Sequence, residues 1–504
     1  MLVLAFACVS PVSSGLAEAS AAPASSVATG PDGPVTGIAR YLQQTMNRLQ
    51  FQQVLDLAPP GSVQFRALDS GVNEDATTPG QRERLYTADT SPKPIIQQPQ
   101  IDATVLELDT AGRIVSSGTV LMSPKYRHGI VVPVDRNFHS SDVRWTQWDD
   151  LGWYTNHGEG TIDVVPGREH APIDFMLPYP ASVLKLMVNF GVLQLVDKGE
   201  IKLDGTYNYR PTTASSLCGP ATSDTVRGYI DASLTWSSNA ASCALIKLLW
   251  EHGAISRLNQ EFQDLGLETL QLQGTNPANG GNWSNAITMS SLDTAKLLAL
   301  INGAPGPLWT APDGQPVTSA VLSASSRSLF KDELGQQGFN WMLSTTNYCD
   351  AAYPGPGIPQ VTAKRWIAAG GPGPAGSTAP VGSTGTADST APAGSTAPID
   401  GSVTVDGAYF GRDVLPCNRA AQVTFMHKTG WVSNSGSDAG IVTSLPGKAY
   451  RHYIIAVFSN LGDQYQDPKR PLTPTGVVPV EYTQKFAELG RAIDQYEAAL
   501  PGPH

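Results

Sequence analysis

The sequence predicts a fold of the α/β (α+β) class, in which strands lie near both ends of the chain and helices occupy the middle. Strand-like runs at 104–109 and 113–115, alternation at 423–428 and apolar runs at 439–442 and 453–458 predict strands. Segments 182–199, 240–251 and 290–301 are instead apolar at helical spacing. At 504 residues, the chain is long enough for two or three domains, or for one large domain with insertions.

The N-terminus has the pattern of a secretory leader. Its first ten residues are apolar, and both 17–19 and 19–21 fit an A-x-A cleavage site. We therefore expect residues 1–21 to be a signal peptide and the protein to be exported, whether periplasmic, at the cell surface or secreted. No Lys or Arg precedes the apolar run, so either the true start lies upstream or the segment is only an apolar N-terminus. No later segment is apolar over the ~18–20 residues of a membrane span.

Residues 22–95 are predicted as an N-terminal linker with one helix, and residues 96–500 as the main domain. Helical spacing of apolar residues predicts an amphipathic helix over 35–57. The triplet Thr-Ala-Gly at 110–112 separates two strand-like runs and predicts a hairpin. The aromatic-rich stretch 123–178 either lines a cleft or belongs to the core, and we favour the core.

The run from Ser182 to Gly199 is apolar on all sides, which indicates a buried helix. Pro178 and Pro180 stand just before its start, where proline is tolerated. Residues 370–399 repeat the sequence Pro-Ala-Gly-Ser-Thr-Ala-Pro and are predicted as a low-complexity, flexible insertion. Further strands are expected at 423–428, 439–442 and 453–458, and a last helix over 481–500.

Charge and cysteine content limit the partners and the compartment. The net charge of -11 and the lack of a basic run disfavour nucleic acid and anionic membrane surfaces, so we expect a small-molecule or peptide partner and a monomer. Four cysteines follow the leader and allow three pairings. In an oxidising compartment we favour Cys349–Cys417, which closes a long loop at a gain of about 4 kcal/mol, and Cys218–Cys243. Four buried thiols are the alternative.

Three short motifs carry the chemistry, and the first contains Ser182 and Lys185. Residues three apart on a helix share a face, so the amine reaches the hydroxyl. The helix start adds unpaired N–H groups and the positive end of the helix dipole. To accept a proton the amine must be neutral, which burial and a second cation favour. The pair therefore predicts a serine nucleophile activated by a lysine. A second Ser-x-x-Lys, Ser328 to Lys331, lies in a polar neighbourhood and is set aside.

The second motif is Ser237-Ser238-Asn239, directly before an expected helix. Taken alone, Ser or Asn at this place is typical of a helix N-cap. In combination with the first motif, the Ser237 hydroxyl can relay a proton to a leaving nitrogen. The Asn239 amide can then bind an amide of the substrate.

The third motif, Lys428-Thr429-Gly430, lies on a predicted strand. Lys428 can attract a substrate carboxylate, Thr429 can hydrogen-bond it, and Gly430 lets a substrate backbone lie close. The N–H groups of Ser182 and Trp431 are predicted to form an oxyanion hole. The candidate site therefore comprises three catalytic residues, Ser182, Lys185 and Ser237, and five substrate-binding residues, Asn239, Lys428, Thr429, Gly430 and Trp431.

In this order, the three motifs resemble those of the penicillin-recognising serine hydrolases, most of all the class A β-lactamase-type enzymes. His427 before Lys428 and the final helix add to the resemblance, which covers roughly 100–200, 225–302 and 418–500. It implies an antiparallel sheet flanked by N- and C-terminal helices, an all-helical lobe on the other side, and long insertions. It also implies a site between the lobes that needs no metal or organic cofactor. The eight histidines show no metal-ligand spacing.

The chain departs from the class A pattern at two points. Those enzymes carry a Glu-x-x-Leu-Asn loop whose glutamate helps water to hydrolyse the acyl-enzyme. The corresponding stretch, 267–288, contains Glu268 as its one carboxylate, followed by Thr-Leu-Gln. Ser238 also stands where class A enzymes have aspartate. The resemblance therefore implies intact acylation chemistry and leaves fast deacylation in doubt.

The leading hypothesis is an exported serine hydrolase that opens β-lactam amide bonds through an acyl-serine intermediate. A D,D-carboxypeptidase or penicillin-binding protein acting on cell-wall stem peptides would use the same residues in the same roles. The third hypothesis is a sensor or binding protein that is acylated once or never.

Overall fold

The computed structural model describes residues 36–56, 93–213, 215–349, 357–367, 401, 403–405, 408–409, 413–462, 464–466 and 483–501. The predicted signal peptide, the insertion at 370–399 and most of the linker at 22–95 lie outside these residues.

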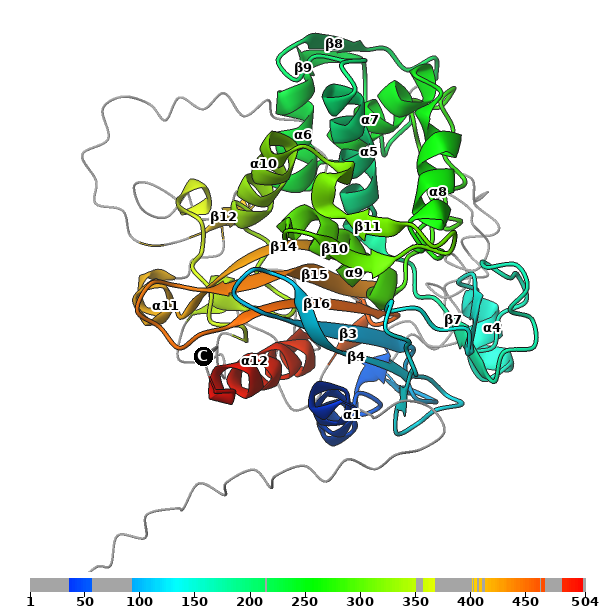
Figure 1. The fold of residues 1–504 in the computed structure, drawn as a ribbon, viewed down its shortest axis with the longest axis vertical. Helices are drawn as coiled ribbons and strands as arrows, with labels where there is room; N and C mark the ends of the chain where they lie inside the picture. Colours follow the sequence, from blue (N-terminus) through cyan, green and yellow to red (C-terminus); the bar gives the residue numbers. More distant parts are fainter. Residues whose placement is uncertain are drawn as a thin grey trace, which may run out of the picture.

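A six-stranded antiparallel sheet joins the two ends of the chain (Figure 1). Its order is β14-β15-β16-β3-β4-β5, so the N-terminal hairpin pairs with the last long strand, with Leu106 opposite Ile454. The strands are β3 (Ile101–Leu108), β4 (Ile114–Met122), β5 (Ile130–Val131), β14 (Val423–Val432), β15 (Ser435–Ser444) and β16 (His452–Ser459). The strands expected near the two ends therefore form one sheet, and the predicted fold class is confirmed.

Helices α1 (Gly37–Leu49) and α12 (Thr483–Ala499) lie side by side on one face of this sheet (Figure 1). The rings of Tyr41 and Tyr496 stack between them with centroids 4.6 Å apart. A Cβ on Gly118 of β4 would lie 2.6 Å from the Cα of Ala39, so glycine lets the helix lie directly on the strand. The predicted helix over 35–57 ends early, because Gln50 adopts a left-handed conformation at its C-cap.

The opposite face of the sheet is covered by a helical lobe (Figure 1). Its helices are α5 (Lys185–Asp197), α6 (Val226–Leu234), α7 (Asn239–Glu251), α8 (Ala254–Asp264), α9 (Ser291–Asn302) and α10 (Ala324–Gly335). Helix α9 contacts β3, β15 and β16 and so joins the lobe to the sheet. Of these six helices, α6, α8 and α10 were not predicted.

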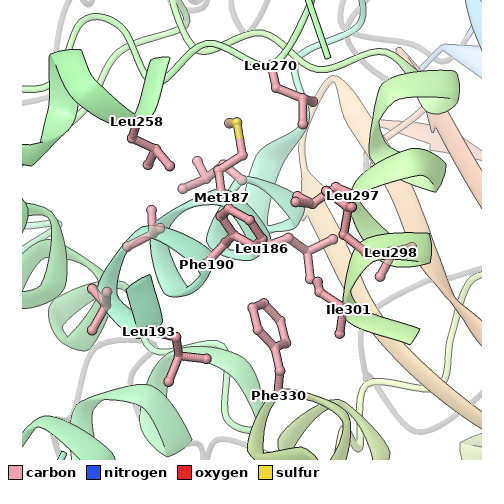
Figure 2. Close-up of a cluster of buried hydrophobic side chains, with 14 of the residues drawn as sticks. Leu186, Met187, Phe190, Leu193, Leu258, Leu270, Leu297, Leu298, Ile301 and Phe330 are labelled. Carbon is pink, nitrogen blue, oxygen red and sulfur yellow. The ribbon is translucent and has the colours of Figure 1, made fainter. Parts of the chain in front are cut away.

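The all-apolar pattern of the segment after Ser182 is explained by its position inside the lobe. Every residue of α5 from Lys185 to Leu195 is buried. Met187 and Phe190 of this helix lie among side chains from α8, α9 and α10, including Leu258, Leu297 and Phe330 (Figure 2). Full burial of such a side chain contributes about 1.5–3 kcal/mol.

Strand alternation separates this core from a second one between the sheet and α1/α12. In β16, Ile454 and Ala456 face the lobe, whereas Ile455 and Val457 face the terminal helices. Both sets are fully buried, which explains why the strand is apolar from Tyr453 to Phe458. In the stretch 123–178, Trp145, Trp148 and Trp153 are buried, as the core interpretation expects.

The remaining short elements connect these layers. They are β1 (Leu55–Asp56), β2 (Lys93–Pro94), β6 (Val143–Thr146), α4 (Asp150–Thr155), β7 (Ile173–Met176), η2 (Ala181–Leu184), β8 (Thr206–Tyr209), β9 (Thr222–Thr225), β10 (Pro307–Thr310), β11 (Pro316–Thr318), η3 (Ser319–Val321), η4 (Thr346–Tyr348), η5 (Lys364–Trp366), β12 (Thr404–Val405), β13 (Ala408–Tyr409), α11 (Leu415–Ala420) and β17 (Tyr465–Gln466). Both favoured disulfides, Cys218–Cys243 and Cys349–Cys417, are present. Among the helices of the described residues, none is both long and apolar enough to cross a membrane.

Candidate active site

Ser182 lies in the short 3-10 turn η2 that precedes the buried helix α5. Ala181, directly before it, has a positive φ of 46°, which is uncommon for a residue with a side chain. Ala181 and Val183 are buried, whereas Ser182 is partly exposed. The turn thus presents the Ser182 hydroxyl at the open end of an otherwise interior segment.

Lys185 is fully buried, and four oxygens surround its Nζ. They are Ser182 Oγ at 2.9 Å, Ser237 Oγ at 3.1 Å, Asn239 Oδ1 at 2.8 Å and the carbonyl oxygen of Ser237. An ammonium group has only three N–H bonds, so it cannot donate to all four at once. A neutral amine likewise offers three sites, two N–H bonds and one lone pair, and the lone pair can accept the Ser182 proton.

Ser237 lies between α6 and α7 with a positive φ of 56°. The N-cap of α7 is Ser238, whose hydroxyl accepts a hydrogen bond from Ala241 N at 3.2 Å. The capping interpretation of this motif therefore applies to Ser238. Ser237 and Asn239 instead direct their side-chain oxygens to Lys185.

The third motif lies on β14, the edge strand next to the lobe. Lys428 is fully buried, and its Nζ lies 2.9 Å from Ser237 Oγ and 2.7 Å from the carbonyl oxygen of Thr429. The Ser237 hydroxyl is thus shared by two lysine side chains from different parts of the chain. The Thr429 hydroxyl donates to the carbonyl of Phe339 at 2.8 Å, so its proton must turn before it can serve a substrate carboxylate.

Gly430 is explained by a backbone contact within the protein. A Cβ at this position would lie 2.5 Å from Pro180 O and 2.9 Å from Ser182 N. Any side chain would therefore push β14 away from the turn that carries Ser182. Trp431 follows, partly buried, with its ring 5.0 Å from that of Trp341.

Behind the site, β14 carries a buried polar network that sequence reasoning missed. His427 is fully buried; its Nδ1 lies 2.8 Å from Asp438 Oδ1, and its Nε2 lies 3.1 Å from Asn340 Oδ1 and 3.3 Å from Gln360 Nε2. Alternation along the strand directs His427 and Lys428 to opposite faces. This network fixes the strand directly behind the third motif.

The one carboxylate of the stretch expected to supply a deacylating base, Glu268, and the next one along the chain, Asp293, are engaged elsewhere. Glu268 pairs with Arg168 at 2.9 Å and lies 3.5 Å from His139. Burial alone would raise the pKa of Glu268, but His139 and Arg168 outweigh it and lower the pKa. Asp293, just beyond the stretch, accepts hydrogen bonds from the backbone N and hydroxyl of Thr269, and its pKa is raised by burial.

The structure thus brings Ser182, Lys185, Ser237, Asn239 and Lys428 into one connected group, with Thr429 and Gly430 beside it. Within the described part of the chain, no group of three or more His, Cys, Asp or Glu side chains is suited to hold a metal ion.

The comparison with family models agrees with the resemblance given by the motifs. Residues 177–344, which carry the first two motifs, match the family model described as "Beta-lactamase enzyme family". The similarity to penicillin-recognising serine hydrolases is therefore confirmed over that segment. No curated protein matches the chain.

Several solved structures are similar at low identity. PBP-A is 15% identical, with 80% of this chain and 91% of that chain covered and a TM-score of 0.38. A β-lactamase from Chitinophaga pinensis is 17% identical, with 63% and 85% covered and a TM-score of 0.36. A β-lactamase from Sphaerobacter thermophilus is 14% identical, with 80% and 94% covered and a TM-score of 0.37.

Proposed function

We propose that the protein is an exported serine hydrolase that opens β-lactam amide bonds through an acyl intermediate on Ser182. The observation that carries the proposal is the unbroken series of contacts from Ser182 to Lys185, Ser237 and Lys428, at 2.9, 3.1 and 2.9 Å. The series contains a nucleophile, a base, a second hydroxyl and a cation, in contact with one another.

Lys185 takes the proton of Ser182 in the acylation step. The amine must be neutral to do so, and two features favour the neutral form. Lys185 is fully buried, and the ammonium of Lys428 contacts the same Ser237 hydroxyl, so two positive charges here would repel each other. General-base assistance of this kind is worth about 10²–10⁴-fold in rate.

Ser237 passes the proton on to the leaving nitrogen. Its hydroxyl lies between the two amines, 3.1 Å from Lys185 Nζ and 2.9 Å from Lys428 Nζ. The N–H groups of Ser182 and Trp431 stabilise the oxyanion, since the contact at Gly430 brings β14 against the turn of Ser182.

The substrate carboxylate binds to Lys428 and Thr429. Asn239 is exposed, and because its Oδ1 accepts from Lys185, its amide N–H₂ is the group that can donate to a substrate carbonyl. The two disulfides support export, because such bonds persist in oxidising compartments.

Deacylation is the slow step in this proposal. The engaged carboxylates Glu268 and Asp293 leave no loop glutamate of the class A type to activate water. The same observation favours a second candidate function, a D,D-carboxypeptidase or penicillin-binding protein that acts on stem peptides.

The test is incubation of the purified protein with penicillin G, followed by intact mass and by ring opening. We expect a penicilloyl adduct that is absent in Ser182→Ala and retained in the matched control Ser328→Ala. Repeated turnover supports the β-lactamase function, and a persistent adduct with release of D-Ala from a stem peptide supports the second candidate. A persistent adduct without D-Ala release points to a sensor. Ring opening that survives Ser182→Ala would refute the proposed nucleophile.

A further inference from the structure

We infer that residues 357–367 form a positioning arm, which holds the second and third motifs at their working separation through Trp366 and Arg365. The inference rests on the proposed function for its kinetic consequences, although its structural part can be tested separately. The arm follows the expected helical lobe in sequence and lies outside every predicted motif.

The arm begins alongside β14. Gln360 forms a β-bridge with Val423, the first residue of the strand, and the backbone N of Gln422 donates to Pro359 O at 2.8 Å. The Gln360 side chain also lies 3.3 Å from His427 Nε2. The arm therefore contacts both the start of the third-motif strand and the residue before Lys428.

The arm next reaches the second motif, where Trp366 and Arg365 contact Trp236. This residue directly precedes Ser237, and its ring stacks on that of Trp366 with centroids 4.4 Å apart. The guanidinium of Arg365 lies 5.2 Å from the same ring and pairs with Asp231 through two contacts of 2.8 Å. Because Trp236 contacts both Trp366 and Arg365, the backbone that gives Ser237 its positive φ is held as well.

Trp366 also touches the segment that anchors Thr429. Its ring lies 5.1 Å from that of Phe339, whose carbonyl accepts the Thr429 hydroxyl. Its indole N–H donates to Gln336 O at 2.6 Å. A Cβ on Gly338 would lie 1.9 Å from the ring, so the chain there is shaped around this one side chain.

One fully enclosed ring, 1% exposed, thus touches the neighbour of Ser237 and the neighbour of Thr429. Ser237 belongs to the lobe, and Thr429 belongs to the edge strand β14 of the sheet. The arm therefore sets the 2.9 Å contact between Lys428 and Ser237, on which the proposed proton transfer depends. Trp366 and Arg365 are positioning residues: they act on acylation through Trp236 and Phe339.

The kinetic test compares variants of the full-length protein by stopped-flow acylation with a fluorescent penicillin. We expect Trp366→Ala to lower the limiting acylation rate constant by about 10²-fold, as a misplacement of about 1 Å can do, with the dissociation constant unchanged. Trp366→Phe should restore part of the rate. Arg365→Ala should cause a smaller loss that Arg365→Lys partly restores. Lys364 is exposed in the same turn, so Lys364→Ala is the matched control and should be acylated at the wild-type rate.

A second readout does not depend on catalysis. In folded Trp366→Ala, or in Arg365→Ala if the first variant does not fold, hydrogen exchange should speed up in peptides covering 235–241 and 425–432, but not in α8. An unchanged acylation rate, a change confined to the dissociation constant, or unchanged exchange at both motifs would overturn the inference. If the wild type is never acylated, the proposed function fails, while the exchange measurement still decides the role of the arm.

Discussion

The two Ser-x-x-Lys pairs of this chain have the same spacing on helical backbone and very different surroundings. Lys185 is fully buried, and its Nζ lies 2.9 Å from the Ser182 hydroxyl. Ser328 is exposed on α10, and Lys331 donates to the carbonyl of Asn302 at 3.0 Å. Burial, followed by the charge of Arg327, lowers the pKa of Lys331, so a lowered amine pKa by itself does not make a catalytic pair.

The difference lies in what other segments bring to each pair. Ser182 stands at the open start of a helix, where backbone N–H groups lack intrahelical partners. Ser328 is the fifth residue of α10, where those groups bond within the helix. Only the first pair meets Ser237 from α6–α7 and Lys428 from β14 among the contacts of the described residues. The Ser-x-x-Lys spacing allows a proton transfer within each pair. The first pair forms a candidate site because residues from α5, the α6–α7 connection and β14 meet there.

Replacing the lysine of each pair tests this comparison with the largest expected effect. Lys185→Met should lower the acylation rate constant for penicillin by about 10²–10⁴-fold, because it removes the general base. Lys331→Met should leave the rate unchanged within error. Stopped-flow acylation measures both, and thermal melting checks that each variant folds. A large loss in Lys331→Met with an intact fold would contradict the assignment.

The neighbouring residues Ser237 and Ser238 allow a second test with a smaller expected effect. Ser237→Ala should lower the acylation rate by about 10²-fold, since it removes the shared hydroxyl between the two lysines, with little change in stability. Ser238→Ala removes the N-cap of α7 and should cost about 1 kcal/mol of unfolding free energy. Urea unfolding and stopped-flow acylation on both variants separate the two effects. If Ser237→Ala proved purely destabilising, the proton relay would be excluded.

Local patterns predicted the parts of this molecule that depend on local order. The buried helix after Ser182 follows from its apolar residues, and the strands follow from apolar runs or, at 423–428, from alternation. The partners of each site residue depend on contacts between distant segments instead. Lys428 reaches Ser237 over a separation of 191 residues, and His427 reaches Gln360 over 67. The positioning arm was missed for the same reason. Trp366 belongs to no periodic pattern, and its role depends on its contacts with Trp236 and Phe339, which are distant in sequence.

Glu333, on the helix of the second pair, is connected to the active site indirectly, through Asp231 and Arg365 of the positioning arm, and its titration gives the smallest predicted effect. Burial, and then the hydrogen bond with Asp231, raise the pKa of Glu333 on α10 to about 7 from the ordinary 4.5. The partner Asp231 has a lowered pKa: burial opposes this, and Arg365 and Glu333 outweigh it. Between about pH 4.5 and 7 the folded state therefore holds more of the Glu333 proton than the unfolded state, so this contribution to stability is full below pH 4.5 and lost as the pH rises through 7.

Glu333→Gln should remove this slope, which is at most one proton, or about 1.4 kcal/mol per pH unit. Urea unfolding from pH 5 to 8 measures it, with Asp332→Asn, exposed on the same helix, as the control. The pH profile of acylation below pH 7 should change less than the stability profile, because neither Glu333 nor α10 supplies a group to Ser182. If Glu333→Gln kept the wild-type dependence of stability on pH, the raised pKa assigned to Glu333 would be wrong. If Glu333→Gln instead lowered the acylation rate constant as much as Lys185→Met does, the separation between the two Ser-x-x-Lys helices would be refuted.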